Sequence, residues 1–325
     1  MTEGTRVDAR AVITRVAGLA ASVLLVLWGA ATLAFLALRV IPGDPVDVML
    51  GPQAQVSEEV KAGIRAELGL DRPPLEQYLA YLGRLLHGDL GESYQLRMPV
   101  TEVIGRQLGA TLQLTALALV LAALTAFAVA LFARGTATRT AVAAVELVVL
   151  SSPVFWIGLV LLSVFAFGLG WFPVSGSRNP ATLVLPAVTL ALPVAALLGQ
   201  VLRDGIVQAE RQPFATTVRA RGAGHTWLTL HHTLRHGATG ALTLAAYFVG
   251  SLLGGAVLVE TVFARPGIGR VTLTAITDRD LPVITGIILL SALVFVIVNL
   301  LVEVLYPVLD PRLRSARPAR PRSLS

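Results

Sequence analysis

Six long stretches of this chain contain little or no charge. A helix needs about 20 apolar residues to cross the ~30 Å hydrocarbon core of a bilayer, so each stretch predicts one membrane-spanning helix. In the longest stretch, Gly168, Gly170, Pro173 and Gly176 separate a span from a short loop. The predicted spans are 16–38, 107–133, 141–167, 181–202, 237–259 and 281–302. The first is longer than the roughly 7–15 apolar residues of a signal peptide, which favours a retained span.

The composition agrees with a membrane protein. Hydrophobic residues make up 55% of the chain and charged residues only 14%, whereas soluble domains carry about 25% charge. This balance excludes most soluble enzymes. Cysteine is absent, which excludes disulfides, thiolate catalysis and cysteine-ligated metal sites. The net charge of +6 is typical of basic loops beside a membrane, and we expect no nucleic acid partner because a soluble basic patch does not come with such apolar runs.

Arginine and lysine are concentrated in alternate segments, which predicts the orientation. With the N-terminus inside, the inner segments hold 15 basic residues and the short outer loops hold 4. Six spans then place both termini in the cytoplasm of a multi-pass protein of the inner (plasma) membrane. The inner segments are the N-terminus 1–15, the turn 134–140, the loop 203–236 and the basic tail 303–325, and the outer ones include the long segment 39–106 and the loop 260–280.

The external segment 39–106 has helical patterns of its own. Ser57 is a plausible N-cap for a helix that ends at Gly69. Pro73 and Pro74 begin a second helix over 75–86. One face of that helix is apolar, which fits a partner protein, the membrane surface or a cap on the chain's own helices equally well. That face consists of Leu75, Tyr78, Leu79, Leu82 and Leu86.

Catalytic motifs are missing from the sequence. The only lysine, Lys61, does not follow a glycine-rich turn, so the chain has no phosphate-binding loop. It also lacks the zinc-protease and nucleophile-elbow patterns. The spacing of His232 and His236 permits a metal, but a basic surface that contacts a partner or lipid fits better. We therefore predict a chain that is not an enzyme and has no metal or cofactor of its own.

Two features inside the spans are open to more than one interpretation. Glu146 is the only ionisable residue well inside a span, and it fits a proton relay, a snorkelling side chain or a contact with a neighbouring helix. Gly250, Gly254 and Gly255 lie in a small-residue stretch that favours close helix packing, within this chain or against another. Three functions therefore stay open: a transport subunit driven by another protein, a proton-coupled secondary carrier, and a membrane scaffold.

The loop 203–236 is the most informative segment. Residues 214–220 predict a short helix that ends at Gly222, with Phe214 and Val218 on one face. In a chain without an ATP-hydrolysing motif, such a helix suggests a docking site for a motor subunit. A solvated linker is the alternative.

Several short sequence blocks follow one another in a specific order. They are Arg39-Val40-Ile41-Pro42-Gly43-Asp44-Pro45, Leu68-Gly69-Leu70-Asp71, Gln77-Tyr78-Leu79, Gly88-Asp89-Leu90-Gly91, Arg219-Ala220-Arg221-Gly222, Glu260-Thr261-Val262-Phe263, Pro266-Gly267-Ile268-Gly269 and Asp310-Pro311-Arg312. Together they resemble the first (B-type) permease subunit of oligopeptide and dipeptide ABC importers, over about residues 16–314. Gly240 departs from the family, which usually has proline there, and Thr216 stands where a basic residue is common.

The resemblance implies an all-α, type I ABC importer permease fold with six transmembrane helices. It implies a second permease, one or two ATPase subunits that hold the ATP and magnesium, and an external substrate-binding lipoprotein. The family imports oligopeptides, dipeptides, glutathione or nickel chelates, and the absence of an outward cluster of metal ligands favours peptides. The expected ATPase-coupling residues are Phe214, Ala215, Val218, Arg219, Ala220, Arg221, Gly222, His232 and Arg235, and the expected external gate or binding-protein face is Asp44, Glu260, Pro266, Gly267 and Gly269.

Overall fold

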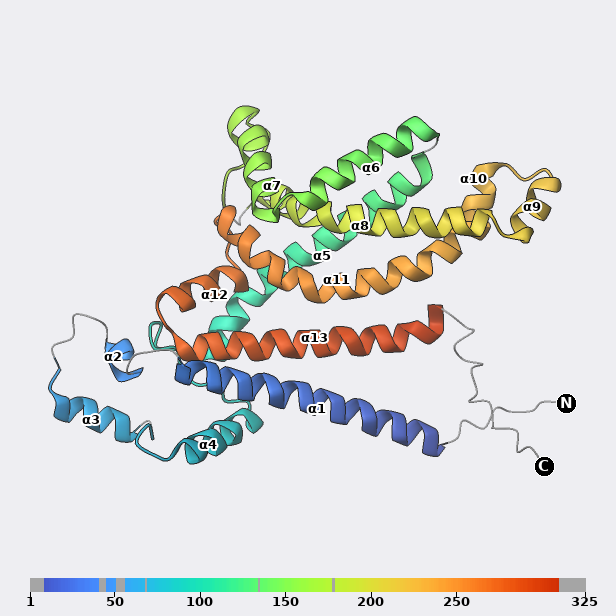
Figure 1. Cartoon of the computed structure of the whole chain (residues 1–325). Coiled ribbons are helices and arrows are strands. Elements are labelled where there is room, and N and C mark those ends of the chain that lie inside the picture. Colours follow the sequence, from blue (N-terminus) through green and yellow to red (C-terminus); the bar gives the residue numbers. More distant parts are fainter. Residues whose placement is uncertain are drawn as a thin grey trace, which may run out of the picture. The chain divides into compact units, whose positions relative to one another are not determined.

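The computed structural model describes residues 9–40, 45–50, 56–67, 69–133, 135–176 and 179–309. These residues are almost entirely helical (Figure 1). Asp44, the first eight residues of the predicted N-terminus and the last sixteen of the predicted tail lie outside this part of the chain. The chain divides into two compact units, one formed by residues 1–108 with 271–297 and the other by 109–270 with 298–325.

Four helices are long and apolar enough to cross a membrane unbroken: Ala17–Ala37, Val100–Phe132, Pro180–Glu210 and Leu281–Leu301. Two further spans arise if each of two bent helix pairs is counted as one. The prediction of an all-α, multi-pass membrane protein is therefore confirmed. The helices are α1 (Ala9–Val40), α2 (Pro45–Leu50), α3 (Glu58–Glu67), α4 (Pro74–Leu86), α5 (Val100–Phe132), α6 (Thr136–Ser151), α7 (Val154–Leu161), α8 (Val184–Glu210), α9 (Pro213–Ala220), α10 (His225–Leu228), α11 (Leu234–Val262), α12 (Ile268–Thr277) and α13 (Leu281–Leu309).

The predicted span 141–167 contains a sharp corner. Helices α6 and α7 meet there at 108° (Figure 1), and a π-helical segment, Leu162–Gly168, continues α7. The corner follows from Pro153, which has no N–H to donate and forces the residue before it out of the helical region. Ser152 accordingly has an extended backbone, with ψ of 135°. The apolar run predicts that this segment lies in the membrane, but it does not predict the change of helix axis at the corner.

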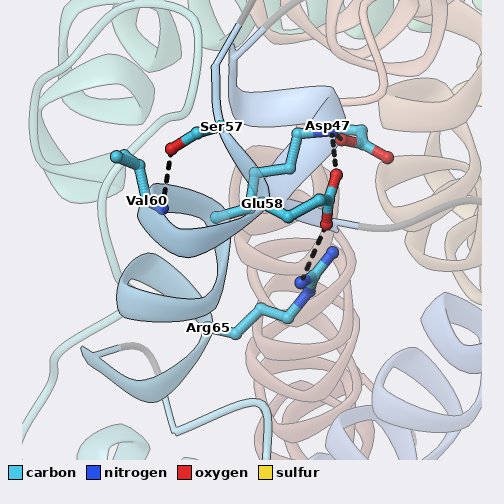
Figure 2. A network of polar contacts seen from close by, with 6 residues as sticks. Asp47, Ser57, Glu58, Val60 and Arg65 are labelled. Carbon is cyan, nitrogen blue, oxygen red and sulfur yellow. Dashed lines mark hydrogen bonds and ion pairs between the residues drawn. The ribbon is translucent and has the colours of Figure 1, made fainter.

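The first unit joins α1, α3 and α4 to the start of α5 and to α13. Ser57 lies at the start of α3, where its hydroxyl accepts from the Val60 N–H at 3.5 Å. The Lys61 ammonium bridges Asp47 of α2 and Glu58 of α3, at 2.7 and 3.1 Å, and Glu58 also faces Arg65 (Figure 2). The Lys61–Asp47 pair therefore fixes α2 to α3.

Asp280, just before α13, anchors a second part of the segment 39–106. Its side chain is buried and accepts from the Ser93 hydroxyl and from the backbone N–H groups of Tyr94 and Gln95. A buried carboxylate needs such donors to offset the loss of water. The loop before α5 is therefore held to the beginning of α13.

The second unit has a core of unusually small side chains. Ala118, Ala122 and Ala126 recur every four residues along α5 and are buried together with Leu190 and Ala191 of α8. Helices in lipid gain little from hydrophobicity and depend on close packing instead. The small side chains permit that approach.

Helices α8 and α11 lie side by side in Figure 1 and touch at glycines. A Cβ at Gly205 of α8 would overlap the Gly237 Cα of α11, and a Cβ at Gly237 would lie 2.7 Å from the Leu202 carbonyl oxygen. Gly240, the position where the family usually has proline, faces Val201 of α8 in the same way. The two helices thus form a hairpin whose closest contact is near the connecting loop.

The glycines of the small-residue stretch in α11 have different surroundings in the structure. A Cβ at Gly255 would meet Leu190 of α8 at 3.4 Å, whereas one at Gly254 would meet nothing within 4 Å. Gly250 is half-buried. A bend of 52° separates Thr243–Leu252 from Gly254–Val262. Gly255 therefore has a partner helix at its Cβ position and Gly254 does not, and the packing role of Gly250 and Gly254 stays a prediction.

The glycine contact gives a first prediction. Gly237→Ala forces α8 and α11 apart and should cost about 1–3 kcal/mol of stability, the usual penalty of overpacking. Gly254→Ala is the matched control on the same helix, because its Cβ enters open space and alanine favours helices by about 1 kcal/mol over glycine. Thermal unfolding of the detergent-solubilised chain should show a lower Tm for Gly237→Ala only. Equal Tm values would contradict the close contact.

Candidate functional site

The loop between α8 and α11 forms a compact, capped structure. Helix α8 does not end with the apolar run at residue 202 but continues to Glu210. Helix α9 then starts at Pro213, whose fixed φ suits the first helical position. Its end has two crossed hydrogen bonds, from Gly222 N–H to the Arg219 carbonyl and from Ala223 N–H to the Val218 carbonyl. Gly222 adopts φ of +85°, as the glycine of this helix-ending motif must.

The apolar face of α9 points into its own chain. Ala215 is completely buried, Phe214 and Val218 are half-buried, and the Phe214 ring lies 6.4 Å from the His232 ring. Sequence analysis expected this face to be available for a motor subunit. Of the expected coupling residues, those that are exposed are instead Arg219, Ala220, Arg221 and Gly222. The outer surface of α9 is therefore basic and polar. The side chain of Arg235 lies outside the described part of the chain.

Helix α10 and the π-helical segment Thr229–Thr233 complete the loop. Trp227 is half exposed and stacks on His231 at 4.8 Å, while His232 meets it edge-on at 5.1 Å. Leu228 and Thr233 are buried beneath them. Sequence analysis missed Trp227, although an exposed tryptophan in a basic loop is itself a signal for a contact surface.

Glu146 makes an ion pair with Arg203 of α8. Arg203 Nη1 donates to Glu146 Oε1 at 2.7 Å, and Nη2 donates to Oε2. Glu146 is 7% exposed, and Gly199 of α8 leaves room for the pair, since its Cβ would lie 3.3 Å from Glu146 Oε1. Of the interpretations left open by the sequence, the structure thus favours contact with a neighbouring helix. A cavity of about 410 Å³ lies beside the pair, lined also by Arg139 and Asp204.

Glu260 is the centre of the loop that follows α11. Its side chain is fully buried and accepts from the Thr111 hydroxyl at 2.6 Å and from the N–H of Gly269 at 2.8 Å and of Arg270 at 3.3 Å. The last two N–H groups belong to the first turn of α12, which has no partners within the helix for them. The Glu260 charge also suits the positive end of that helix.

The glycines of the Pro266-Gly267-Ile268-Gly269 block fit around this carboxylate. A Cβ at Gly267 would overlap the Glu260 carboxylate, and one at Gly269 would lie 2.8 Å from the Val257 nitrogen. Pro266 is half-buried. These residues were expected at an external gate or binding-protein face, and that expectation stays a prediction. Because Glu260, Gly267 and Gly269 are buried, they shape the loop from within rather than form its surface.

Arg265 lies in the same loop and is 4% exposed. Its backbone N–H donates to the Glu260 carbonyl at 2.8 Å, while its Nε has no partner among the described residues. Burial lowers the pKa of Arg265 from its ordinary value, and the nearby Glu260 charge acts in the opposite direction. Nothing in the sequence pattern singled out this residue.

Comparison with known proteins identifies the family. Residues 118–315 match the binding-protein-dependent transport system inner membrane component, and residues 9–115 match the N-terminal part of such membrane components. The chain therefore belongs to the binding-protein-dependent transport system inner membrane component family. This confirms the predictions of a multi-pass inner membrane protein and of an ABC importer permease.

Relatives of similar length support the assignment. The chain is 35% identical to the glutathione transport system permease protein GsiC of Salmonella choleraesuis over 306 residues, which cover 93% of this chain and 98% of the relative. It is 36% identical to the di/tripeptide transport system permease protein DppB of Pseudomonas aeruginosa, over 89% of this chain and 95% of the relative. These relatives are transport subunits, which confirms that the chain is not an enzyme.

Among solved structures, a chain of an amino acid ABC transporter aligns with a TM-score of 0.48 and 20% identity, over 65% of this chain and 94% of its own length.

The buried ion pair gives a second prediction. Glu146→Gln or Arg203→Met alone leaves one buried group without its partner and should destabilise the chain by about 3–5 kcal/mol. The double variant Glu146→Leu with Arg203→Met removes both charges and should recover most of the loss in thermal unfolding. If the double variant also keeps substrate uptake, Glu146 is not a proton relay. A double variant as unstable as the singles would contradict the pairing.

The Glu260 network gives a third prediction. Thr111→Val removes the hydroxyl that donates to Glu260 and accepts from the Ile268 N–H at 2.8 Å, leaving buried polar groups unpaired at a cost of about 1–3 kcal/mol. Thr115→Val is the matched control, because the Thr115 hydroxyl, also buried, donates only to carbonyls of its own helix. Tm should fall for Thr111→Val and change little for Thr115→Val. Similar losses for both would show that Thr111 has no special role.

Proposed function

We propose that this chain is one of two permeases that together form the translocation pathway of an ATP-driven importer of short peptides. In this proposal, α9 and α10 are the seat of an ATPase subunit, and an external lipoprotein delivers the substrate. Family membership implies a complex with ATPase and substrate-binding partners. The number and kind of subunits belong to the proposal.

The exposed, capped helix α9 at the end of the α8–α11 hairpin is the observation that carries the proposal. A chain without an ATP-hydrolysing motif needs an external source of work, and a rigid helix at a hairpin end is suited to receive it. The hydrogen bonds at Gly222 end α9 in a defined way, and the buried Ala215 together with the Phe214 ring beside His232 holds the helix against its own chain. A partner that moves α9 would therefore move the hairpin with it.

The exposed surface of α9 indicates the chemistry of the partner groove. Arg219 and Arg221 are exposed in its last turn and just after it, so an ATPase groove that receives them would present acidic or carbonyl groups. Arg219 also lies 3.8 Å from Glu210 of α8, which keeps its side chain near the hairpin. Phe214 and Val218 are half-buried against the loop, and their contact with the ATPase stays a prediction.

The substrate class rests on the relatives. Those described above are named for glutathione and for di- and tripeptides, and further relatives are named as putative peptide permeases of Brucella species. Short peptides share backbone amides and charged termini, so one pathway serves many sequences if the external binding protein provides selectivity. Oligopeptides or dipeptides therefore remain favoured over a nickel chelate.

Transport then follows a two-state cycle. ATP binding closes the ATPase dimer and draws the α9 helices of the two permeases together. The hairpins tilt, and the pathway opens toward the binding protein. Hydrolysis separates the ATPases and returns the pathway to its inward-open state. The described residues offer no specific observation for the alternative of a proton-coupled carrier, since Glu146 is occupied by Arg203.

A charge reversal tests the proposed ATPase seat. Arg219→Glu with Arg221→Glu should reduce co-purification of the ATPase subunit and ATP-dependent uptake of a labelled dipeptide roughly tenfold or more, since like charges at an interface cost at least about 1.4 kcal/mol. Stability of the permease itself should fall by no more than about 1 kcal/mol, because both arginines are exposed and the 3.8 Å ion pair of Arg219 with Glu210 is weak. Arg72→Glu, an exposed arginine of the external segment, is the control. Full uptake by the double variant would contradict the assignment of α9 to the ATPase seat.

A further inference from the structure

Helix α4 leaves a row of large apolar side chains uncovered. Leu75, Leu79 and Leu86 are 67%, 58% and 87% exposed, and Leu82, which lies between them on the same face, is half-buried. At 100° per residue these four side chains form one stripe along the helix. No residue of α4 is fully buried, so the helix depends on something beyond the described chain to cover this stripe.

A second side of α4 is fixed to α1. The Tyr78 and Thr32 hydroxyls share a hydrogen bond of 2.7 Å, and Gln77 Oε1 accepts from Arg39 at 2.7 Å. The Phe35 ring lies 5.2 Å from the Tyr78 ring and 5.8 Å from the Tyr81 ring. Burial raises the pKa of Tyr81 to about 12, and its hydroxyl has no partner among the described residues.

A third side of α4 is polar and faces water. Glu76, Ala80 and Arg84 follow one another at four-residue spacing and are all exposed. The helix thus has three sides with different chemistry: one packed on α1, one polar and one apolar but uncovered. This division is typical of a helix that lies in an interface between water and an apolar phase.

The contacts with α1 fix the level of α4 relative to the membrane. The apolar span of α1 covers Ala17–Ala37, so Thr32 lies five residues, or about 7.5 Å, inside its end. Interfacial helices bury their apolar face about 5–10 Å into the boundary between headgroups and acyl chains. Arg39, just beyond the span, and the two tyrosines are residue types that membrane interfaces favour.

Helix α1 also has uncovered apolar side chains near the end of its span. Leu33 and Leu36, in the same last turns of the span, are 69% and 52% exposed. Because α1 crosses the bilayer, side chains at this level meet lipid unless another subunit covers them. The apolar stripe of α4 is attached to α1 at this same level, so lipid would surround it as well.

We propose that α4 is an interfacial helix, and that lipid of the outer leaflet covers the stripe formed by Leu75, Leu79, Leu82 and Leu86. The helix would then fix the external segment to the membrane surface beside α1. This inference rests on α1 crossing the membrane in the orientation predicted from the sequence, and it is independent of the peptide substrate and of the ATPase seat.

The absence of cysteine from the chain permits a direct test with spin labels. Single variants Leu79→Cys and Leu86→Cys would be labelled in the complete transporter, reconstituted in phosphatidylcholine–phosphatidylglycerol vesicles. Ala80→Cys and Arg84→Cys, on the polar side of the same helix, are matched controls, and Leu33→Cys of α1 is the lipid reference. Electron paramagnetic resonance then compares collisions with oxygen, which dissolves in lipid, and with a water-soluble nickel complex.

Labels at positions 79 and 86 should favour oxygen over the nickel complex several-fold, as at position 33, while labels at 80 and 84 should show the reverse. Strong nickel collisions at 79 and 86 would place the stripe in water and overturn the proposal. Protection from both reagents would also overturn it, because the stripe would then be covered by another subunit. Quenching of a fluorophore at position 79 by lipids with shallow nitroxide labels provides a second, independent measurement of the same contact.

Discussion

The glycine contact between α8 and α11 is the packing interaction on which the proposed machinery depends. Lipid offers helices no hydrophobic reason to associate, so their backbones must approach closely to gain from packing and weak hydrogen bonds. Gly205 and Gly237 provide that approach, and they lie near the two ends of the connecting loop. The hairpin is therefore closed most tightly just where α9 and α10 leave it. A loose hairpin would let α9 move alone, and work done on the loop would not reach the spans.

Buried carboxylates provide the second level of order. Glu146 pairs with Arg203, Glu260 accepts from a hydroxyl and two N–H groups, and Asp280 accepts from the same kinds of donor in the segment before α5. Each joins elements that are distant in the sequence. Charges in such surroundings are costly unless every lone pair is satisfied. This is why residues that looked like a relay or a gate in the sequence have structural partners.

The sequence predicted those features that depend on local pattern. Charge-free runs predicted a multi-pass membrane protein, residues 214–220 with Gly222 predicted the short helix α9, and Ser57 predicted the start of α3. Features that depend on distant partners were not predictable. The residues around 203 do not indicate that α8 continues past the apolar run, where Arg203 pairs with Glu146. Thr111 has no sequence feature that distinguishes it from other threonines in apolar helices. Pro153 marks a break inside the apolar run 141–167, but a proline alone does not predict a corner as sharp as 108°.

Helix α11 takes part both in the glycine contact and in a buried carboxylate network. A movement of α9 would therefore be transmitted through α11. Near its start α11 contacts α8 through Gly237, and near its end Glu260 binds Thr111 of α5 and the first turn of α12. A tilt of the hairpin therefore cannot leave α5 or the loop after α11 in place unless hydrogen bonds to a buried carboxylate break. Their replacement by water is unavailable in an apolar environment, so such breakage is costly. The bend of 52° between Thr243–Leu252 and Gly254–Val262 lies between the two fixed points. A change of angle at this bend would let both ends of α11 keep their partners.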